Sequence, residues 1–130
     1  MFRRFQPGEW GERAAARALR RKGLRILGRR VRVGDRDELD LVARDGEVLV
    51  FVEVKTRKTE DFGAPISAVD RRKRHALSRA AVRYLRDRRY PPVNLRFDVV
   101  EVLGSEGDKT PEIRHVENAF LLDRRYTLPF

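Results

Sequence analysis

The side chains most able to do chemistry lie in one short segment, residues 38–55. They are three acids and a lysine, in two apolar runs separated by Asp45 and Gly46: Glu38, Asp40, Glu53 and Lys55. Asp-Gly between apolar runs predicts a β-hairpin, because both turn residues accept a positive φ. We therefore predict two antiparallel strands that carry the acids near the end away from the turn.

The predicted turn determines which residues of the two strands face each other. With Asp45 and Gly46 in the loop, Asp40 lies opposite Phe51. In the same register Glu38 lies opposite Glu53. Because side chains alternate along a strand, the three acids share one face with the lysine.

Such a cluster of acids needs a counter-charge. Opposed carboxylates destabilise a strand pair, and burying unpaired charge is costly. A hard divalent cation removes both penalties, since Mg²⁺ binds one or two carboxylates and keeps several waters. In the competing interpretation, Glu38 or Glu53 ends a strand in water and Lys55 makes a surface salt bridge. That interpretation suits any one of the residues alone, whereas the four on one face favour a metal site.

Composition limits the class of protein and the kind of partner. The chain has 130 residues, 41% of them hydrophobic, a formal charge of +10 and no cysteine. We expect a single domain over 1–130, with a core over about 8–120 and short tails at both ends. The positive charge favours a polyanionic partner, DNA above all. No apolar run approaches a membrane span, so we expect a cytoplasmic protein with no membrane partner.

The remaining elements follow from periodicity and from turn residues. We predict helices over 8–22 and from Ser67 or Asp70 to Arg88, further strands over 24–33, 95–103 and 111–116, a loop over 56–65, and one helical turn over 118–122. Glu12 lies at the edge of the first helix's buried stripe, and Lys73 extends the stripe of the second towards the sheet. This order predicts an α/β fold with a central mixed β-sheet flanked by helices.

Asp98 and the two histidines are weaker candidates for catalytic residues. Asp98 lies inside a predicted strand beside Phe97, which favours a structural hydrogen bond over catalysis. His75 and His115 lie far apart in the sequence, so we expect ordinary surface or turn roles for them.

The acidic residues also resemble a known nuclease signature. Asp40 followed by Glu53-Val54-Lys55 resembles the PD-(D/E)xK motif, and Glu12 on the upstream helix completes the pattern of archaeal Holliday junction resolvases. More specifically, the chain is similar to the YraN family over about residues 8–120. The matching segments are Gly11-Glu12, residues 38–41, 51–55 and 96–100, Phe62-Gly63, Ala68-Val69, Lys73, Tyr84-Leu85 and residues 118–120.

The resemblance implies a restriction-endonuclease-like core and a metal-dependent endonuclease that hydrolyses DNA, on branched or recombination and repair intermediates. It implies Asp40, Glu53 and Lys55 as catalytic residues, with Mg²⁺ or Mn²⁺ on Asp40 and Glu53. Glu12 would be an additional ligand, and Glu38 either a ligand or a supporting acid. The remaining expectations are nucleic-acid contacts from Lys73, Arg57 and Arg72, and a homodimer by analogy with the resolvases.

A second function class stays open at this point. The chain could be a nucleic-acid-binding module that keeps the nuclease fold but is non-catalytic or depends on a partner. The acids argue against a pure binder, because carboxylates beside a phosphate weaken its affinity.

Overall fold

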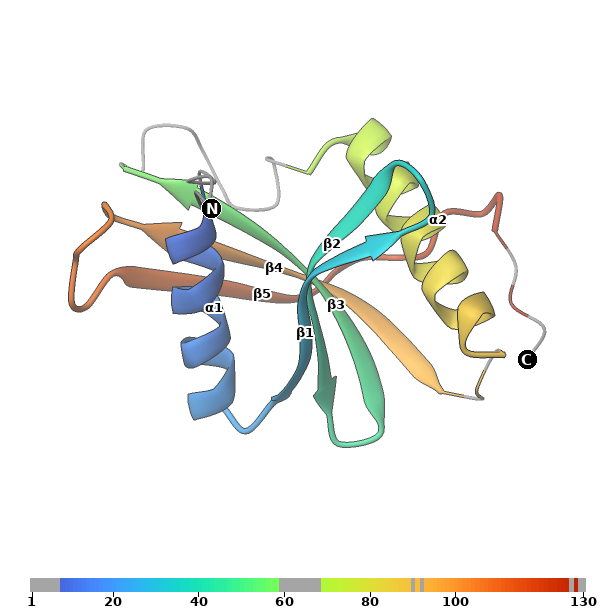
Figure 1. Cartoon of the computed structure of the whole chain (residues 1–130), viewed down its shortest axis with the longest axis horizontal. Coiled ribbons are helices and arrows are strands. Elements are labelled where there is room, and N and C mark those ends of the chain that lie inside the picture. Colours follow the sequence, from blue (N-terminus) through green and yellow to red (C-terminus); the bar gives the residue numbers. More distant parts are fainter. Residues whose placement is uncertain (1–7, 59–68, 90, 92, 127, 129–130) are drawn as a thin grey trace, which may run out of the picture.

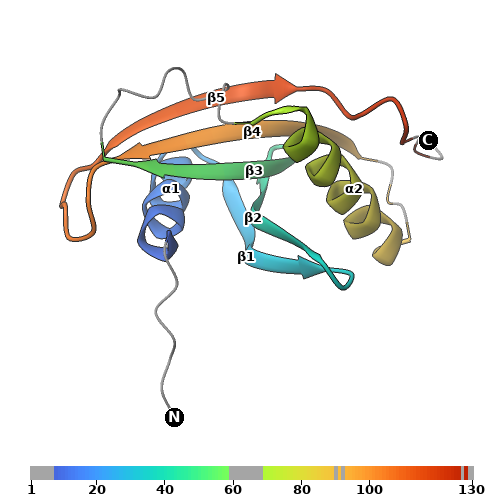
Figure 2. The ribbon, with the colours of Figure 1, turned by 90° about the horizontal axis from the view of Figure 1, so that it is seen from above.

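The computed structural model contains one twisted five-stranded sheet with two helices (Figures 1 and 2). It describes residues 8–58, 69–89, 91, 93–126 and 128. The elements are α1 Glu9–Arg21, β1 Arg25–Val33, β2 Asp37–Asp45, β3 Val48–Arg57, α2 Arg71–Asp87, β4 Asn94–Leu103 and β5 Glu112–Phe120. The predicted loop over 56–65 begins later than expected because β3 continues to Arg57, and its residues 59–65 lie outside the described ones.

The strands are ordered as they occur in the chain, β1-β2-β3-β4-β5. Only β3 and β4 are parallel, and α2 lies between them in the sequence; the other neighbours are antiparallel. This confirms the predicted α/β fold with a central mixed sheet flanked by helices, which is consistent with a restriction-endonuclease-like core. No helix in the described part of the chain is long and apolar enough to cross a membrane.

Local chemistry explains where α1 ends and where α2 begins. The left-handed backbone that follows α1 is provided by Gly23, whose φ of 94° suits a residue without Cβ. Asp70 caps α2, because its carboxylate accepts a hydrogen bond of 2.9 Å from the Lys73 backbone N–H. The cap starts α2 at Arg71 and places Lys73 in its first turn.

Two hydrophobic clusters hold the helices to opposite faces of the sheet. The predicted stripe of α2, which includes Leu77 and Tyr84, is buried against Phe51 and Phe97. The alanines and Leu19 of α1 pack against the other face, in a cluster with valines of β3 and β4. In Figure 2, β1 and β2 curl away from the other strands and extend between the two helices.

The hairpin forms, but its predicted turn is wrong by one residue. The last pair of the β2–β3 ladder is Asp45 with Val48, so Gly46 and Glu47 are the loop residues. Gly46 has a φ of 59°, as the first residue of a type II′ turn requires. Asp45 stays in the strand, where its carboxylate accepts a hydrogen bond of 2.9 Å from Arg96 of β4.

The corrected turn moves the register by two residues and so changes the predicted pairs. Phe51 pairs with Val42 and not with Asp40, while Glu38 pairs with Arg32 of β1 and not with Glu53. A shift of two residues keeps every side chain on its predicted face. The acids therefore still lie on one side of the hairpin, and the same register continued beyond Leu41 sets Asp40 level with Glu53.

The last strand is longer than predicted, and the helical turn expected over 118–122 is absent. β5 continues to Phe120, whose ring stacks on Phe97 at a centroid distance of 4.8 Å. A register shift between Phe97 and Val99 lets the Asn118 N–H donate to the Asp98 carboxylate at 3.0 Å. Packing of aromatic rings across the strand pair thus extends β5 where local propensity predicts a turn.

Asp98 is completely buried and organises this part of the sheet, which confirms its predicted structural role. It also accepts hydrogen bonds from Arg96 at 3.0 Å and from His115 at 2.7 Å. Burial raises its pKa, but these donors outweigh burial and hold the pKa below its ordinary value. The predicted surface role of His115 is wrong, because only 4% of its side chain is exposed.

Replacing Asp98 by asparagine should destabilise the protein strongly. The amide cannot accept all these hydrogen bonds, and breaking a buried ionic network costs about 3–5 kcal/mol. Urea unfolding at neutral pH would measure the loss, with exposed Asp87→Asn as the control. Because the folded-state pKa is lowered, the advantage of the wild type should shrink as the pH falls below about 4. An equal free energy of unfolding for both variants would contradict this role.

Candidate functional site

Half-buried Asp40 of β2 and buried Glu53 of β3 form an acidic pair, which we call the acidic centre. One carboxylate oxygen of Asp40 accepts a hydrogen bond of 2.9 Å from the Val54 backbone N–H. Glu53 is only 4% exposed. Burial and then the charge of Asp40 raise the pKa of Glu53 to about 7. The two carboxylates therefore compete for a proton or for another cation.

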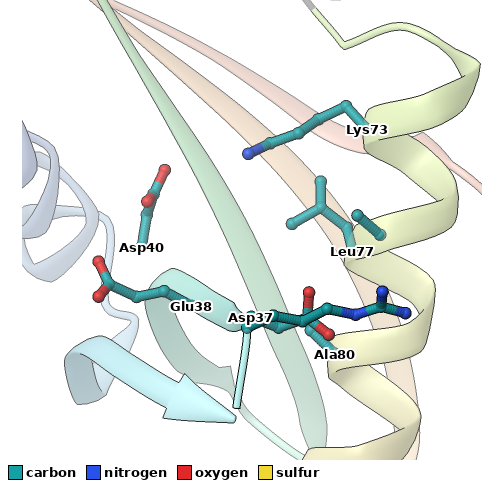
Figure 3. A pocket seen from close by; sticks show the side chains of 8 residues that line it. Asp37, Glu38, Asp40, Lys73, Leu77 and Ala80 are labelled. Carbon is teal, nitrogen blue, oxygen red and sulfur yellow. The ribbon is translucent and has the colours of Figure 1, made fainter. Parts of the chain in front are cut away.

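Two lysines face the acidic centre from different elements. Lys55 of β3 and Lys73 of α2 place their Nζ atoms 3.6 Å and 3.4 Å from Glu53 Oε1. Figure 3 shows Lys73 extending from α2 towards Asp40, as its place on the helical stripe predicts. Both ammonium groups lower the pKa of Glu53, but burial and Asp40 outweigh them. Burial of Glu53, more than any surplus of negative charge, is therefore what makes its carboxylate compete for a proton or another cation.

Glu12 approaches the same centre from α1. It is buried, and its Oε1 accepts a hydrogen bond of 2.6 Å from Arg30 Nε of β1. Burial and the charge of Asp40 raise the pKa of Glu12, while Arg30 lowers it. Glu12 is thus within electrostatic reach of Asp40, but Arg30 already holds one of its oxygens.

Glu38 lies at the rim of a cavity beside the centre. The cavity has a volume of about 370 Å³. Its lining consists of four charged residues at and before β2 and four residues of α2: Arg36, Asp37, Glu38, Asp40, Lys73, Ala76, Leu77 and Ala80. In Figure 3, Glu38 and Asp40 lie on β2 across the cavity from Leu77 and Ala80. Glu38 is exposed, and its charge is the weakest of the influences on the pKa of Glu12.

The two arginines predicted to contact nucleic acid have different surroundings. Arg57 Nε lies 3.0 Å from Glu101 Oε2, and the Arg57 side chain is 12% exposed. Its charge is therefore largely committed to a fully buried acid. Arg72 is exposed next to Lys73 at the start of α2. Binding of nucleic acid by either residue stays a prediction.

The comparisons with known proteins identify the family to which the chain belongs. The model of the uncharacterised protein family UPF0102, the YraN family, matches residues 11–102. The chain belongs to this family. The family resemblance that the sequence motifs predicted is therefore confirmed.

Relatives in this family match over most of their lengths. A UPF0102 protein of Syntrophotalea carbinolica is 44% identical, and the match covers 94% of this chain and 97% of the relative. A UPF0102 protein of Symbiobacterium thermophilum is 47% identical, with coverage of 87% and 94%. A third, of Pelotomaculum thermopropionicum, is 44% identical, with coverage of 87% and 93%.

The donor atoms of this UPF0102 protein suit a hard cation shared with water or substrate. Within the described ranges, no three or more His, Cys, Asp or Glu side chains gather closely enough to hold a metal ion alone. Asp40 and Glu53 nevertheless supply oxygen donors side by side, at a place where Glu53 is buried and its pKa is raised. Mg²⁺ commonly takes one or two carboxylates and fills its other positions with water and phosphate.

Sequence reasoning missed Arg30, which fixes the position of Glu12. Arg30 has a φ of 49°, unusual for an arginine in a strand, and lies just after a register shift between Ile26 and Gly28. A glycine inside a strand pattern signals such a bulge, so Gly28 was the available clue. The clue predicts a bend in β1 but does not predict which acid Arg30 contacts.

The raised pKa of Glu53 predicts that the metal-free protein loses stability as the pH rises. The folded state favours protonated Glu53, so stability should fall between about pH 4.3, the ordinary value, and pH 7, the folded-state value. Glu53→Gln should therefore be more stable than the wild type at pH 8 in a chelator, by up to about 3 kcal/mol. Urea unfolding against pH would measure this, with exposed Glu47→Gln as the control. A wild type that matches Glu53→Gln at pH 8 would refute the prediction.

Proposed function

We propose that this protein is a metal-dependent endonuclease that hydrolyses phosphodiester bonds of DNA. The observation that carries the proposal is the acidic centre, in which buried Glu53 lies beside Asp40 with lysines from two elements next to it. A protein with a formal charge of +10 is suited to a polyanionic substrate. The resemblance to PD-(D/E)xK nucleases gives the same assignment to Asp40, Glu53 and Lys55.

Asp40 and Glu53 would hold Mg²⁺ or Mn²⁺. When bound, the cation would polarise the scissile phosphate and lower the pKa of a water nucleophile. The Val54 N–H orients the Asp40 carboxylate, which fixes one donor before a cation arrives.

The two lysines would act on the phosphate rather than on the cation. Lys55 lies beside Glu53, where its ammonium group would orient the attacking water or stabilise charge that develops on the phosphate. Lys73 reaches the same carboxylate from α2 and is about half exposed, so it would contact a phosphate that enters from solvent. Both can reposition, because an ammonium group on a flexible stem rotates freely.

Glu12 and Glu38 would change the electrostatic potential at the acidic centre. Glu12, held by Arg30, would either be an additional ligand or attract waters that a cation retains. Glu38 lies at the solvent side of the cavity and would take a supporting place there. We further propose branched recombination or repair intermediates as substrates, on the resemblance to Holliday junction resolvases.

A second candidate function is a nucleic-acid-binding module without catalysis of its own, or one whose activity depends on a partner. It is favoured by the described acids, no three of which gather closely enough to hold a metal ion alone. A partner or a substrate phosphate would then have to complete the site. The two candidates differ in one measurable respect, cleavage by the purified protein.

The first test is cleavage of linear, flapped and four-way-junction DNA with Mg²⁺ or Mn²⁺. We expect Asp40→Asn and Glu53→Gln to reduce the rate at least 10²- to 10³-fold, since each removes a charge that acts in the transition state. Glu47→Gln, exposed in the hairpin turn, is the matched control. Cleavage that persists in Asp40→Asn would overturn the mechanism, and binding with no cleavage of any substrate would favour the module.

Cation binding can be tested without any measurement of activity. A ligand that binds only the folded state raises the free energy of unfolding, by about 2.7 kcal/mol at a hundred times its Kd. We expect Mn²⁺ to raise the unfolding temperature of the wild type at pH 8, and to raise those of Asp40→Asn and Glu53→Gln much less. Equal shifts in all three proteins would place the cation elsewhere.

A further inference from the structure

A second basic feature lies apart from the lysines of the acidic centre, in a groove between α1 and β1. This groove, which we call the arginine groove, has a volume of about 250 Å³. It is lined by Ala16 and four arginines: Arg13, Arg17, Arg20 and Arg29. The three arginines of α1 are spaced so that they follow one side of the helix. Arg29 faces them from β1.

These arginines differ from those that stabilise the fold. Arg79 forms two hydrogen bonds to Asp37, Arg96 bonds Asp98, and Arg57 lies against Glu101. In the groove only Arg13 has an acid nearby, Glu9 at 3.1 Å. Arg17, Arg20 and Arg29 are exposed and have no ion-pair partner among the described residues. Like charges gathered without partners repel, which favours an anionic ligand.

Two residues of the arginine groove directly adjoin, in the sequence, Glu12 and the arginine that holds it. Arg13 follows Glu12 in α1, and Arg29 precedes Arg30, the residue that holds Glu12 at 2.6 Å. From there the arginines continue along α1, over about 10 Å from Arg13 to Arg20 at 1.5 Å per residue. Successive phosphates of one DNA strand advance about 3.4 Å along the duplex axis, so this row matches about three phosphate steps. Guanidinium groups bind phosphate oxygens in pairs.

We propose that the arginine groove is a phosphate-backbone site that holds the DNA arm on the α1 side of the acidic centre. Lys73 and Arg72 belong to α2. Figure 2 shows α1 and α2 on opposite sides of β1 and β2. DNA would then be held on both sides of the bond to be cut. The identity of the polyanion rests on the proposed function, whereas the position of the groove does not.

The test measures DNA binding without cleavage, by fluorescence anisotropy of a labelled duplex and a four-way junction in a chelator. The variant Arg17→Gln, Arg20→Gln, Arg29→Gln removes the three unpaired charges. The control, Arg86→Gln, Arg89→Gln, Arg124→Gln, removes the same charge from exposed positions after the middle of α2 and near the C-terminus. Circular dichroism would verify that both variants are folded.

We expect the groove variant to weaken binding about 10²-fold near 0.1 M salt and to reduce the slope of log K against log salt by two to three. The control should reduce the slope by less than one. An unchanged slope in the groove variant would overturn the proposal, and so would equal losses in both variants, which would mean that net charge alone matters. Because no cleavage is measured, loss of the groove and loss of the nuclease assignment give separate results.

Discussion

Burial of the Glu53 carboxylate beside Asp40 is the constraint on which the rest of the structure depends. Glu53 lies inside the sheet, where burial and Asp40 together raise its pKa to about 7. Such a pair persists only if other elements supply donors and cations, because an unpaired buried charge costs several kcal/mol. β3 supplies the Val54 N–H and Lys55, and α2 supplies Lys73. The position of α2 on the sheet thus serves the charged site as well as the core.

The composition of the site could be predicted from the hairpin even though the predicted register was wrong. Alternation along a strand places side chains by parity, and the observed shift of two residues leaves parity unchanged. Asp40 and Glu53 therefore remain on one face, and the new register brings them closer together. A shift of one residue would have placed the acids among the valines of the other face. The turn itself was harder to predict, because Arg96 of a distant strand holds Asp45 in β2.

Long-range partners could not be predicted, since they depend on irregularities that the local sequence only hints at. Arg30 meets Glu12 where β1 shifts register near Gly28, and Asn118 meets Asp98 where β4 and β5 shift register near Phe97. The sequence therefore predicts the helices and strands, but not how they are oriented relative to one another and so which of their side chains come into contact. The helical stripe of α2 was predictable for the opposite reason, because one periodic face has to pack on the sheet.

The structural ion pair at Asp37 and the candidate functional site differ in the basic residue that faces the carboxylate, which is arginine at Asp37 and lysine at Glu53. Arg79 forms two hydrogen bonds to Asp37, at 2.8 Å and 2.9 Å, and this fork geometry occupies both carboxylate oxygens. At Glu53 the cations are lysines, at 3.4 Å and 3.6 Å, beyond the usual length of a charge-assisted hydrogen bond. Lysine there neutralises part of the charge without occupying the oxygen atoms. An arginine at position 73 would bind Glu53 as Arg79 binds Asp37, which would stabilise the fold and remove the donors that a metal ion needs.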